Sequence, residues 1–354
     1  MKSLLPVKPH LPKSSRLIFI ALLLAAFFLP SPYVILAPGN PQNVLGSAIK
    51  ISGTKVYPTT GKLSVTSVMV TDPDSYITGF DILYAWIDKN RAVFPRAQIY
   101  PQGESAAESM KNGAQEMAGS QTNATAAALD YLGYKNKPKL IITEVNKKSN
   151  ANNVLEFDDQ ILSIDDQNFN SSTQLMDYLD KKKPGEFVVV KVLRAGSEVL
   201  SNSIKLSARD DGSAFIGISI QSKFDFPFDV KIQLEETGGP SGGLIFALGI
   251  IEKLTEQDFV NSRNIAGTGT ISTDGLVGPI GGIAEKIIGA KKAGVELFLT
   301  PIENCRDIQN LPEYKNVNKK DKFKIVPVAT LAEAVSVLKL PTGGNFPSCL
   351  ATFQ

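Results

Sequence analysis

The chain has 354 residues, of which 43% are hydrophobic and 20% are charged, and its formal net charge is +2. These proportions are typical of a globular protein long enough for two ordinary domains, and they exclude a disordered chain. The small net charge, without a basic stripe interleaved with aromatic residues, argues against binding to nucleic acid.

Histidine occurs only once, at His10 in the N-terminal tail. Catalysis by a Ser-His-Asp or Cys-His group needs an imidazole beside the nucleophile, so the body of the chain cannot use it. A zinc site of the H-E-x-x-H type is excluded for the same reason. The sequence contains no P-loop motif, so nothing indicates that it binds a nucleotide. We expect no metal and no cofactor, and chemistry confined to hydroxyls, amines, carboxylates and backbone groups.

The N-terminus carries an apolar run, Leu17 to Leu29, which continues after two prolines with residues 33–37. Together they approach the ~20 residues needed to cross a bilayer. Positive charges precede the run, and the first charge after it is Lys50. The positive-inside rule then places residues 1–16 in the cytoplasm and the rest outside. The basic residues before the run are Lys2, Lys8, Lys13 and Arg16.

These features predict a single-pass anchor over residues 17–37 in the plasma membrane. A cleaved signal peptide is the alternative, but no small-x-small cleavage site closely follows the apolar run. Both interpretations export the body of the chain. Export favours a disulfide between Cys305 and Cys349, with two unrelated buried thiols as the alternative.

After the anchor, Lys62 to Thr71 alternates and is rich in β-branched residues, which predicts a strand. Residues 80–88 suit a short helix or a strand. The segment 104–131 is rich in Ala, Met, Gln and Glu and predicts one long helix or two short ones, ending at Leu132-Gly133.

From Lys139 to Leu206 several short strands surround one helical segment, Ser172 to Asp180. The order of these elements over about 70 residues resembles a PDZ domain, here assigned to residues 135–209. The resemblance implies binding of protein or peptide segments, although it does not locate the groove residues. An unrelated small α/β insertion is the alternative.

A glycine-rich turn then links a predicted strand, 230–235, to an apolar helix, 244–254. Within it, Ser241 lies in the sequence Gly-Gly-Pro-Ser-Gly-Gly, so its hydroxyl would be exposed near free N–H groups at the helix start. A plain helix-capping turn is the alternative. The nucleophile elbow of α/β-hydrolases is excluded, because no histidine follows Ser241.

A second motif runs from Gly267 to Lys286. Lys286 falls on a largely apolar helical face, where loss of water would lower the pKa of its amine and allow it to act as a base. The alternative is a solvated lysine, as we expect for Lys291 and Lys292.

Together these two motifs resemble the Lon protease family, which uses a serine–lysine dyad. Gly239-Pro240-Ser241-Gly242-Gly243 matches the family's nucleophile motif, and Pro279-Ile280-Gly281-Gly282 followed by Lys286 matches its lysine motif, 45 residues from Ser241. The resemblance implies that Ser241 is the nucleophile, that Lys286 is the general base and that Thr268 orients the lysine. Supporting roles fall to Gly239, Pro240 and Gly242.

The implied fold is an α/β (α+β) Lon proteolytic domain, interrupted by the PDZ-like domain and preceded by one transmembrane helix. Its parts are residues 50–134 and 210–340, followed by a C-terminal tail, 341–354. The whole resembles the exported PDZ–Lon proteins of Gram-positive bacteria. Because no ATPase module is present, the expected function is an ATP-independent, membrane-anchored serine endopeptidase acting on exported or membrane proteins. The sequence leaves open whether the chain forms a homo-oligomer.

Two other interpretations compete with this one. The chain could be a non-catalytic scaffold that keeps the Lon fold and holds peptides with its PDZ-like domain. It could also be a penicillin-binding type of Ser-Lys enzyme, because residues 47–50 and 52–55 both match S-x-x-K. Neither S-D-N nor K-T-G is present, so these two matches are attributed to chance.

Overall fold

The computed structural model describes residues 13–88, 90–134, 138–169, 171–201, 203–209, 212–234, 238–311, 323–341 and 343–349. His10 and most of the predicted cytoplasmic tail lie outside these ranges. The described chain divides into two compact units, one formed by residues 1–39 and 68–111 and the other by residues 40–67 and 112–354. Each unit is considered by itself.

The first unit contains a small antiparallel sheet with strand order β5-β1-β6. Ile35 of β1, Ile77 and Ala85 of α2 form its small apolar core. Helix α2 begins with a capping box in which the side chains of Thr78 and Asp81 each accept the other's backbone N–H. The elements are α1 (Lys13–Phe28), β1 (Tyr33–Pro38), β5 (Val68–Val70), α2 (Gly79–Ile87), β6 (Ala92–Pro95) and α3 (Arg96–Ile99).

The predicted anchor over residues 17–37 is wrong as a single helical span. Helix α1 ends at Phe28, and the chain after Pro30 and Pro32 forms strand β1, whose Val34, Ile35 and Leu36 are buried. Proline lacks the N–H that a helix requires, so the two prolines separate the apolar run into two elements. In the part of the chain that the structure describes, no helix is both long enough and apolar enough to span a bilayer.

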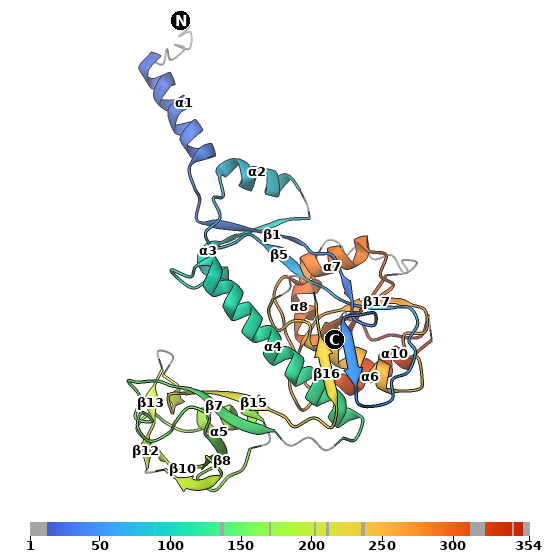
Figure 1. Cartoon of the computed structure of the whole chain (residues 1–354). Helices are drawn as coiled ribbons and strands as arrows, with labels where there is room; N and C mark the ends of the chain where they lie inside the picture. Colours follow the sequence, from blue (N-terminus) through green and yellow to red (C-terminus); the bar gives the residue numbers. More distant parts are fainter. Residues whose placement is uncertain are drawn as a thin grey trace, which may run out of the picture. The chain divides into compact units, whose positions relative to one another are not determined.

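A five-stranded sheet with the order β2-β4-β17-β20-β21 organises the second unit, and its last four strands are parallel. Side chains alternate along β20, so Leu297 and Leu299 pack with α6 and α10 on one face while Phe298 packs with α7 on the other. The strands are thus covered on both faces, as parallel sheets require (Figure 1).

The elements of this layered sheet come from both sides of the PDZ-like segment. Strand β4 pairs with β17, and β3 pairs with β16. The elements are β2 (Gln42–Asn43), β3 (Ile49–Ser52), β4 (Lys62–Val65), α4 (Ala106–Tyr131, which begins in the first unit), β16 (Asp229–Ile232), α6 (Gly243–Leu254), β17 (Asn264–Gly267), β18 (Thr270–Ile271), β19 (Val277–Gly278), α7 (Ile283–Lys292), β20 (Leu297–Pro301), the 3-10 helix η1 (Ile302–Asn304), α8 (Cys305–Ile308), β21 (Lys324–Val328) and α10 (Leu331–Lys339).

The single strand predicted over residues 62–71 is two strands. Its first half, β4, joins the parallel sheet of the second unit, and its second half, β5, pairs with β1 in the first unit. Alternation of side chains reports which residues face a core, but it does not report which partner strand they meet. The segment 80–88 is helical, and 104–131 contains one long helix, α4.

A second sheet, with the order β11-β10-β8-β7-β15, forms the PDZ-like domain together with α5. Strand β15, which follows the predicted end of the domain at residue 209, pairs with β7 along its whole length. Its elements are β7 (Lys139–Val145), β8 (Gln160–Ile164), α5 (Ser172–Asp180), β9 (Phe187–Val188), β10 (Val190–Arg194), β11 (Ser197–Leu200), β12 (Ile204–Lys205), β13 (Ser207–Ala208), β14 (Ala214–Phe215) and β15 (Ile218–Lys223).

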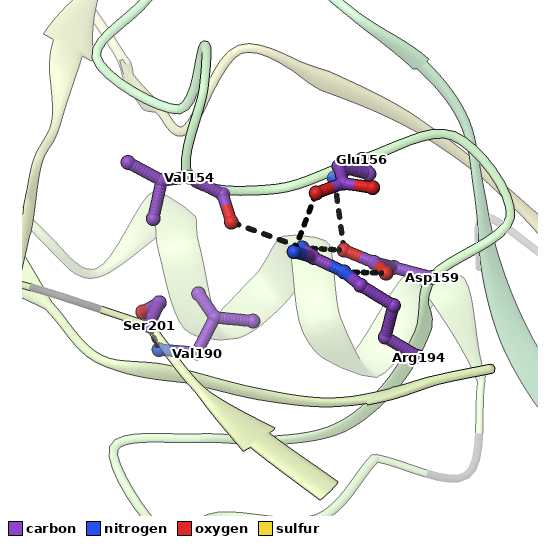
Figure 2. A network of polar contacts seen from close by, with 6 residues as sticks. All are labelled: Val154, Glu156, Asp159, Val190, Arg194 and Ser201. Carbon is purple, nitrogen blue, oxygen red and sulfur yellow. Dashed lines mark hydrogen bonds and ion pairs between the residues drawn. The ribbon is translucent and has the colours of Figure 1, made fainter. Parts of the chain in front are cut away.

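Arg194 at the end of β10 fixes the turn that leads into β8 (Figure 2). Its guanidinium lies 2.6 Å from a carboxylate oxygen of Glu156 and 2.6 Å from one of Asp159, and it donates to the carbonyl oxygen of Val154 at 3.0 Å. Asp159 is almost fully buried, so this paired geometry compensates for its loss of water.

Candidate active site

Ser241 lies in a tight loop between β16 and α6. Within this loop, the backbone of Gly239 has a φ of 84°, a left-handed conformation that favours glycine. A side chain at Gly242 would bring its Cβ to 2.7 Å from the Phe246 ring, so this position also requires glycine. The loop can therefore present Ser241 at the start of a buried helix only with small residues around it.

Helix α4 supports the loop from outside the two motifs. The N–H of Gly239 donates to the carbonyl oxygen of Gly113 at 2.9 Å, and the hydroxyl of Ser120 donates to the carbonyl oxygen of Pro240 at 2.9 Å. Ser120 is only 5% exposed. Sequence reasoning missed both α4 residues, because nothing in an alanine-rich helical segment marks contacts to a loop more than 100 positions away.

Lys286 projects from α7 onto the same loop. Its Nζ lies 2.7 Å from Oγ of Ser241 and 2.9 Å from Oγ1 of Thr268, and the side chain is only 3% exposed. Helix α7 begins after Gly282, whose φ of 66° turns the chain into the helix. The structure therefore brings together the serine and the lysine of the two sequence motifs.

Thr268 follows directly after the C-terminal end of β17 and contacts both residues of the pair. Its hydroxyl donates to the backbone carbonyl of Ser241 at 3.0 Å, which leaves an oxygen lone pair for the Lys286 amine. The N–H of Gly269 also donates to the Ser241 carbonyl, at 2.8 Å. Thr268 therefore bridges the Lys286 amine and the backbone of Ser241.

The surroundings of Lys286 favour its neutral amine. Burial lowers the pKa of Lys286 to about 8, because an ammonium group loses more hydration than an amine does. Its two close side-chain contacts are hydroxyls, and no carboxylate of the described chain forms an ion pair with it. With this pKa, about a tenth of Lys286 is neutral at pH 7 and can accept a proton, and the neutral fraction rises with pH.

The start of α6 offers hydrogen-bond donors beside the Ser241 hydroxyl. The N–H groups of Ser241 and Gly242 have no acceptor among the described residues, while the N–H of Leu244 donates to the carbonyl oxygen of Gly269. Free N–H groups at a helix N-terminus bind negative charge well. The site therefore brings together the Ser241 hydroxyl, the Lys286 amine and two N–H donors.

Two further predicted features can be located. Cys305 and Cys349 form a disulfide with a Cα–Cα distance of 5.1 Å, and both are fully buried in the core that includes Phe298 and α7. The S-x-x-K segments at residues 47–50 and 52–55 fall around β3, whose Lys50 pairs with Lys231 of β16. No group of three potential metal ligands occurs among the described residues.

Comparison with known proteins finds that two family models match parts of this chain. Residues 198–340 match the Lon protease (S16) C-terminal proteolytic domain, and residues 125–206 match the PDZ domain. The first match contains the Ser241 loop, Thr268 and Lys286.

Individual relatives cover only parts of the chain. A Lon protease of Rhizobium meliloti (strain 1021) is 31% identical over 150 residues, which are 41% of this chain and 18% of the relative. A Lon protease of Clostridioides difficile (strain 630) is 34% identical over 173 residues, which are 45% of this chain and 21% of the relative. The chain thus spans about a fifth of the length of these relatives. The PDZ domain of the SdrC-like protein from Listeria monocytogenes is 30% identical and covers 23% of this chain and 86% of that one, with a TM-score of 0.22.

Proposed function

We propose that this protein is a serine endopeptidase of the Lon type, which hydrolyses peptide bonds with a Ser241–Lys286 dyad and without ATP. The observation that carries the proposal is the 2.7 Å contact between Nζ of Lys286 and Oγ of Ser241 in a buried site. The match of residues 198–340 to a Lon proteolytic domain supports the same class of reaction.

The first chemical step is acylation of the serine. Neutral Lys286 accepts the hydroxyl proton of Ser241 while Oγ attacks the peptide carbonyl carbon. The N–H groups of Ser241 and Gly242 stabilise the oxyanion that forms. When the intermediate collapses, the C–N bond breaks and the lysine ammonium returns its proton to the leaving amine.

The second step releases the acyl group. Lys286, again neutral, accepts a proton from a water molecule that attacks the ester carbonyl carbon. Collapse of the second intermediate breaks the bond to Oγ, and the proton returns from Lys286 to Ser241. Thr268 keeps the amine aligned in both steps, because it contacts the amine and the backbone of the nucleophile at once. No net proton is gained or lost by the dyad.

Substrates and location are part of the same proposal. The PDZ match supports recognition of peptide segments of protein substrates, delivered to the Ser241 site.

The buried disulfide is typical of an oxidising compartment, which supports export of the catalytic domain. Exposed apolar side chains along α1 support attachment of the N-terminal segment to a membrane, and include Leu17, Ile18, Phe19 and Leu22. A homo-oligomer is proposed as well, and sedimentation of the detergent-solubilised chain tests it.

Reaction with a serine-directed phosphonate tests the peptidase against the scaffold. We expect one covalent adduct per chain, mapped to Ser241 by mass spectrometry, together with cleavage of peptides. Ser241→Ala should lose both. Ser272→Ala, which removes another partly buried serine of the same domain, should lose neither. Absence of labelling and cleavage across a broad peptide library would favour a scaffold that binds peptides without cutting them.

A further inference from the structure

Helix α2 of the first unit is apolar on nearly every side. Ala85 and Ile82 face the small core made with Ile35 and Val93. The only charged residue within the helix, Asp81, is engaged in the capping box with Thr78. A helix that is hydrophobic all round is normally covered on all sides, either by protein or by a membrane.

The outer face of α2 is nevertheless exposed in the first unit. Its residues recur at helical spacing and form one continuous stripe with a single tryptophan at its border. We call this set the outer face of α2: Phe80 (60% exposed), Leu83 (38%), Tyr84 (55%), Trp86 (80%) and Ile87 (69%). Because three of the five are aromatic and none is charged, the face is far more apolar than an ordinary surface helix.

The outer face continues into the exposed surface of α1. Phe27 of α1 and Leu83 and Trp86 of α2 line one apolar hollow of about 280 Å³. On α1 itself, Leu24 is 50% exposed and Phe28 is 63% exposed. Two neighbouring helices of the same unit therefore expose their apolar side chains around a shared hollow.

The composition of the face fits the boundary region of a bilayer. Tryptophan and tyrosine have an apolar ring and a polar edge, and they concentrate where hydrocarbon meets headgroups. At the border of the face, the guanidinium of Arg91 lies 5.2 Å from the Tyr84 ring and pairs with Asp88 just beyond the helix end. Charge thus borders the aromatic stripe but does not enter it.

We propose that α2 is an interfacial helix whose outer face lies in the lipid headgroup and acyl boundary, beside α1. This proposal builds on the membrane attachment proposed above and adds a second lipid contact, which would fix how the first unit meets the membrane. The occupant is a lipid bilayer, and a second copy of the chain is the alternative that the test must separate.

The chain carries its own reporter, because Trp86 is its only tryptophan. The full chain, with Ser241→Ala to prevent self-cleavage, would be reconstituted into phosphatidylcholine and phosphatidylglycerol vesicles. We expect the Trp86 emission to move to shorter wavelength and to be quenched by lipids brominated near the headgroup. Quenching by aqueous acrylamide should fall severalfold compared with the chain in its denatured state.

A matched reporter controls for non-specific adsorption. In the Trp86→Phe background, Phe157→Trp places the tryptophan at another highly exposed aromatic position, 73% exposed and within the PDZ-like domain. This reporter should remain accessible to acrylamide and insensitive to brominated lipid. Phe80→Ser with Tyr84→Ser, in the chain that retains Trp86, should reduce lipid quenching severalfold. Circular dichroism checks that this variant stays folded.

The outcomes separate the two membrane proposals. If the chain fails to float with vesicles, attachment through the N-terminal segment fails and the α2 proposal fails with it. If the chain floats but Trp86 remains open to acrylamide and insensitive to brominated lipid, only the α2 proposal is overturned. A Trp86 emission that shifts with protein density but ignores brominated lipid would also overturn it, in favour of contact between copies.

Discussion

The two ends of strand β17 show opposite ways of burying a charge. At its N-terminal end, the guanidinium of Arg263 donates to the carbonyl oxygens of Val260 and Leu340 at 3.0 Å, and to those of Phe259 and Leu338. At its C-terminal end, the hydrogen bonds of the Lys286 amine to described residues go to two hydroxyls, one of which belongs to Ser241.

Near Arg263, the buried carboxyl group of Glu252 is also held by several hydrogen bonds. Glu252, 1% exposed, accepts the N–H groups of Phe259 at 3.2 Å and Val260 at 3.1 Å. Burial, together with a hydrogen bond to Asp258, raises the pKa of Glu252 to about 8. Arg263 and Glu252 thus fix the backbone around them, whereas Lys286 is held by few partners and keeps a lone pair for a proton. The comparison teaches that the number of hydrogen-bond partners distinguishes a buried ionisable group that holds the backbone from one that is left able to accept a proton.

The largest expected effect follows from Lys286→Met. Peptide cleavage should fall by at least about 10⁴-fold, because the serine loses its base. At pH 7 the same variant should be more stable than the wild type by about 2 kcal/mol, since a buried amine with a lowered pKa opposes folding. Initial rates and urea denaturation measure the two effects.

The sign of the stability effect can be checked with pH. The pKa of Lys286 is about 8 in the folded chain and 10.5 ordinarily, so the unfolded chain binds more protons between these values. Stability of the wild type therefore rises with pH in that window, and the advantage of Lys286→Met shrinks. A constant or growing advantage between about pH 8 and 10 would contradict the assignment of a depressed lysine.

Arg263→Met should lower stability and leave activity almost unchanged, which is the opposite of the effect of Lys286→Met. Four backbone carbonyl oxygens would lose their donor inside the protein, and the free energy of unfolding should drop by about 3 kcal/mol. Activity per folded molecule should stay within about twofold, because the site at the other end of β17 is unchanged. Lys339→Met, which removes an exposed cation near the Phe259 ring, is the control and should change stability by less than about 0.5 kcal/mol.

Glu252→Gln should change how stability depends on pH. The pKa of Glu252 is about 8 in the folded chain and 4.5 ordinarily, so its contribution is fully present below about pH 4.5 and is lost as pH rises through about 8. Glutamine cannot release a proton, so the variant should gain about 2 kcal/mol relative to the wild type between about pH 5 and 9. If the free energies of unfolding of the variant and the wild type differ by the same amount at both pH values, a protonated Glu252 is refuted.

Ser120→Ala tests the support that α4 gives the nucleophile loop, and its effect should be the smallest. Loss of the hydrogen bond to the Pro240 carbonyl should lower kcat about fivefold to tenfold with little change in KM, because the loop loses alignment. Thr125→Ala is the matched control on the same helix, since the Thr125 hydroxyl donates only to Gln121. Equal effects of the two substitutions on kcat would show that Ser120 acts through general helix stability.

Local patterns in the sequence were sufficient to find the two motifs, but they did not predict the residues that contact these motifs in the fold. Ser241 and Lys286 could be selected from the sequence because a glycine-rich turn and an apolar helical face are each formed by residues close together in the chain. Ser120 could not, because its partner Pro240 lies 120 positions away. Contacts of this kind depend on tertiary packing, which composition and periodicity do not encode.

Two strands were not predicted, for related reasons. Residues 33–37 are apolar because β1 is buried in a sheet, and apolarity alone does not distinguish a buried strand from a membrane span. Strand β15 lies beyond the predicted end of the PDZ-like domain, because its partner β7 comes from the start of that domain. In both cases the missing information was which segment pairs with which.

The most direct test of the Ser241–Lys286 dyad is the rate of phosphonate labelling of Ser241 as a function of pH. The lowered pKa of Lys286 predicts that the rate rises about tenfold per pH unit below neutrality and levels off above about pH 8, because only the neutral amine accepts the proton. Lys286→Met should abolish that dependence together with most of the rate. A rate that stays flat from about pH 6 to 9, or that survives Lys286→Met, would contradict Lys286 as the base.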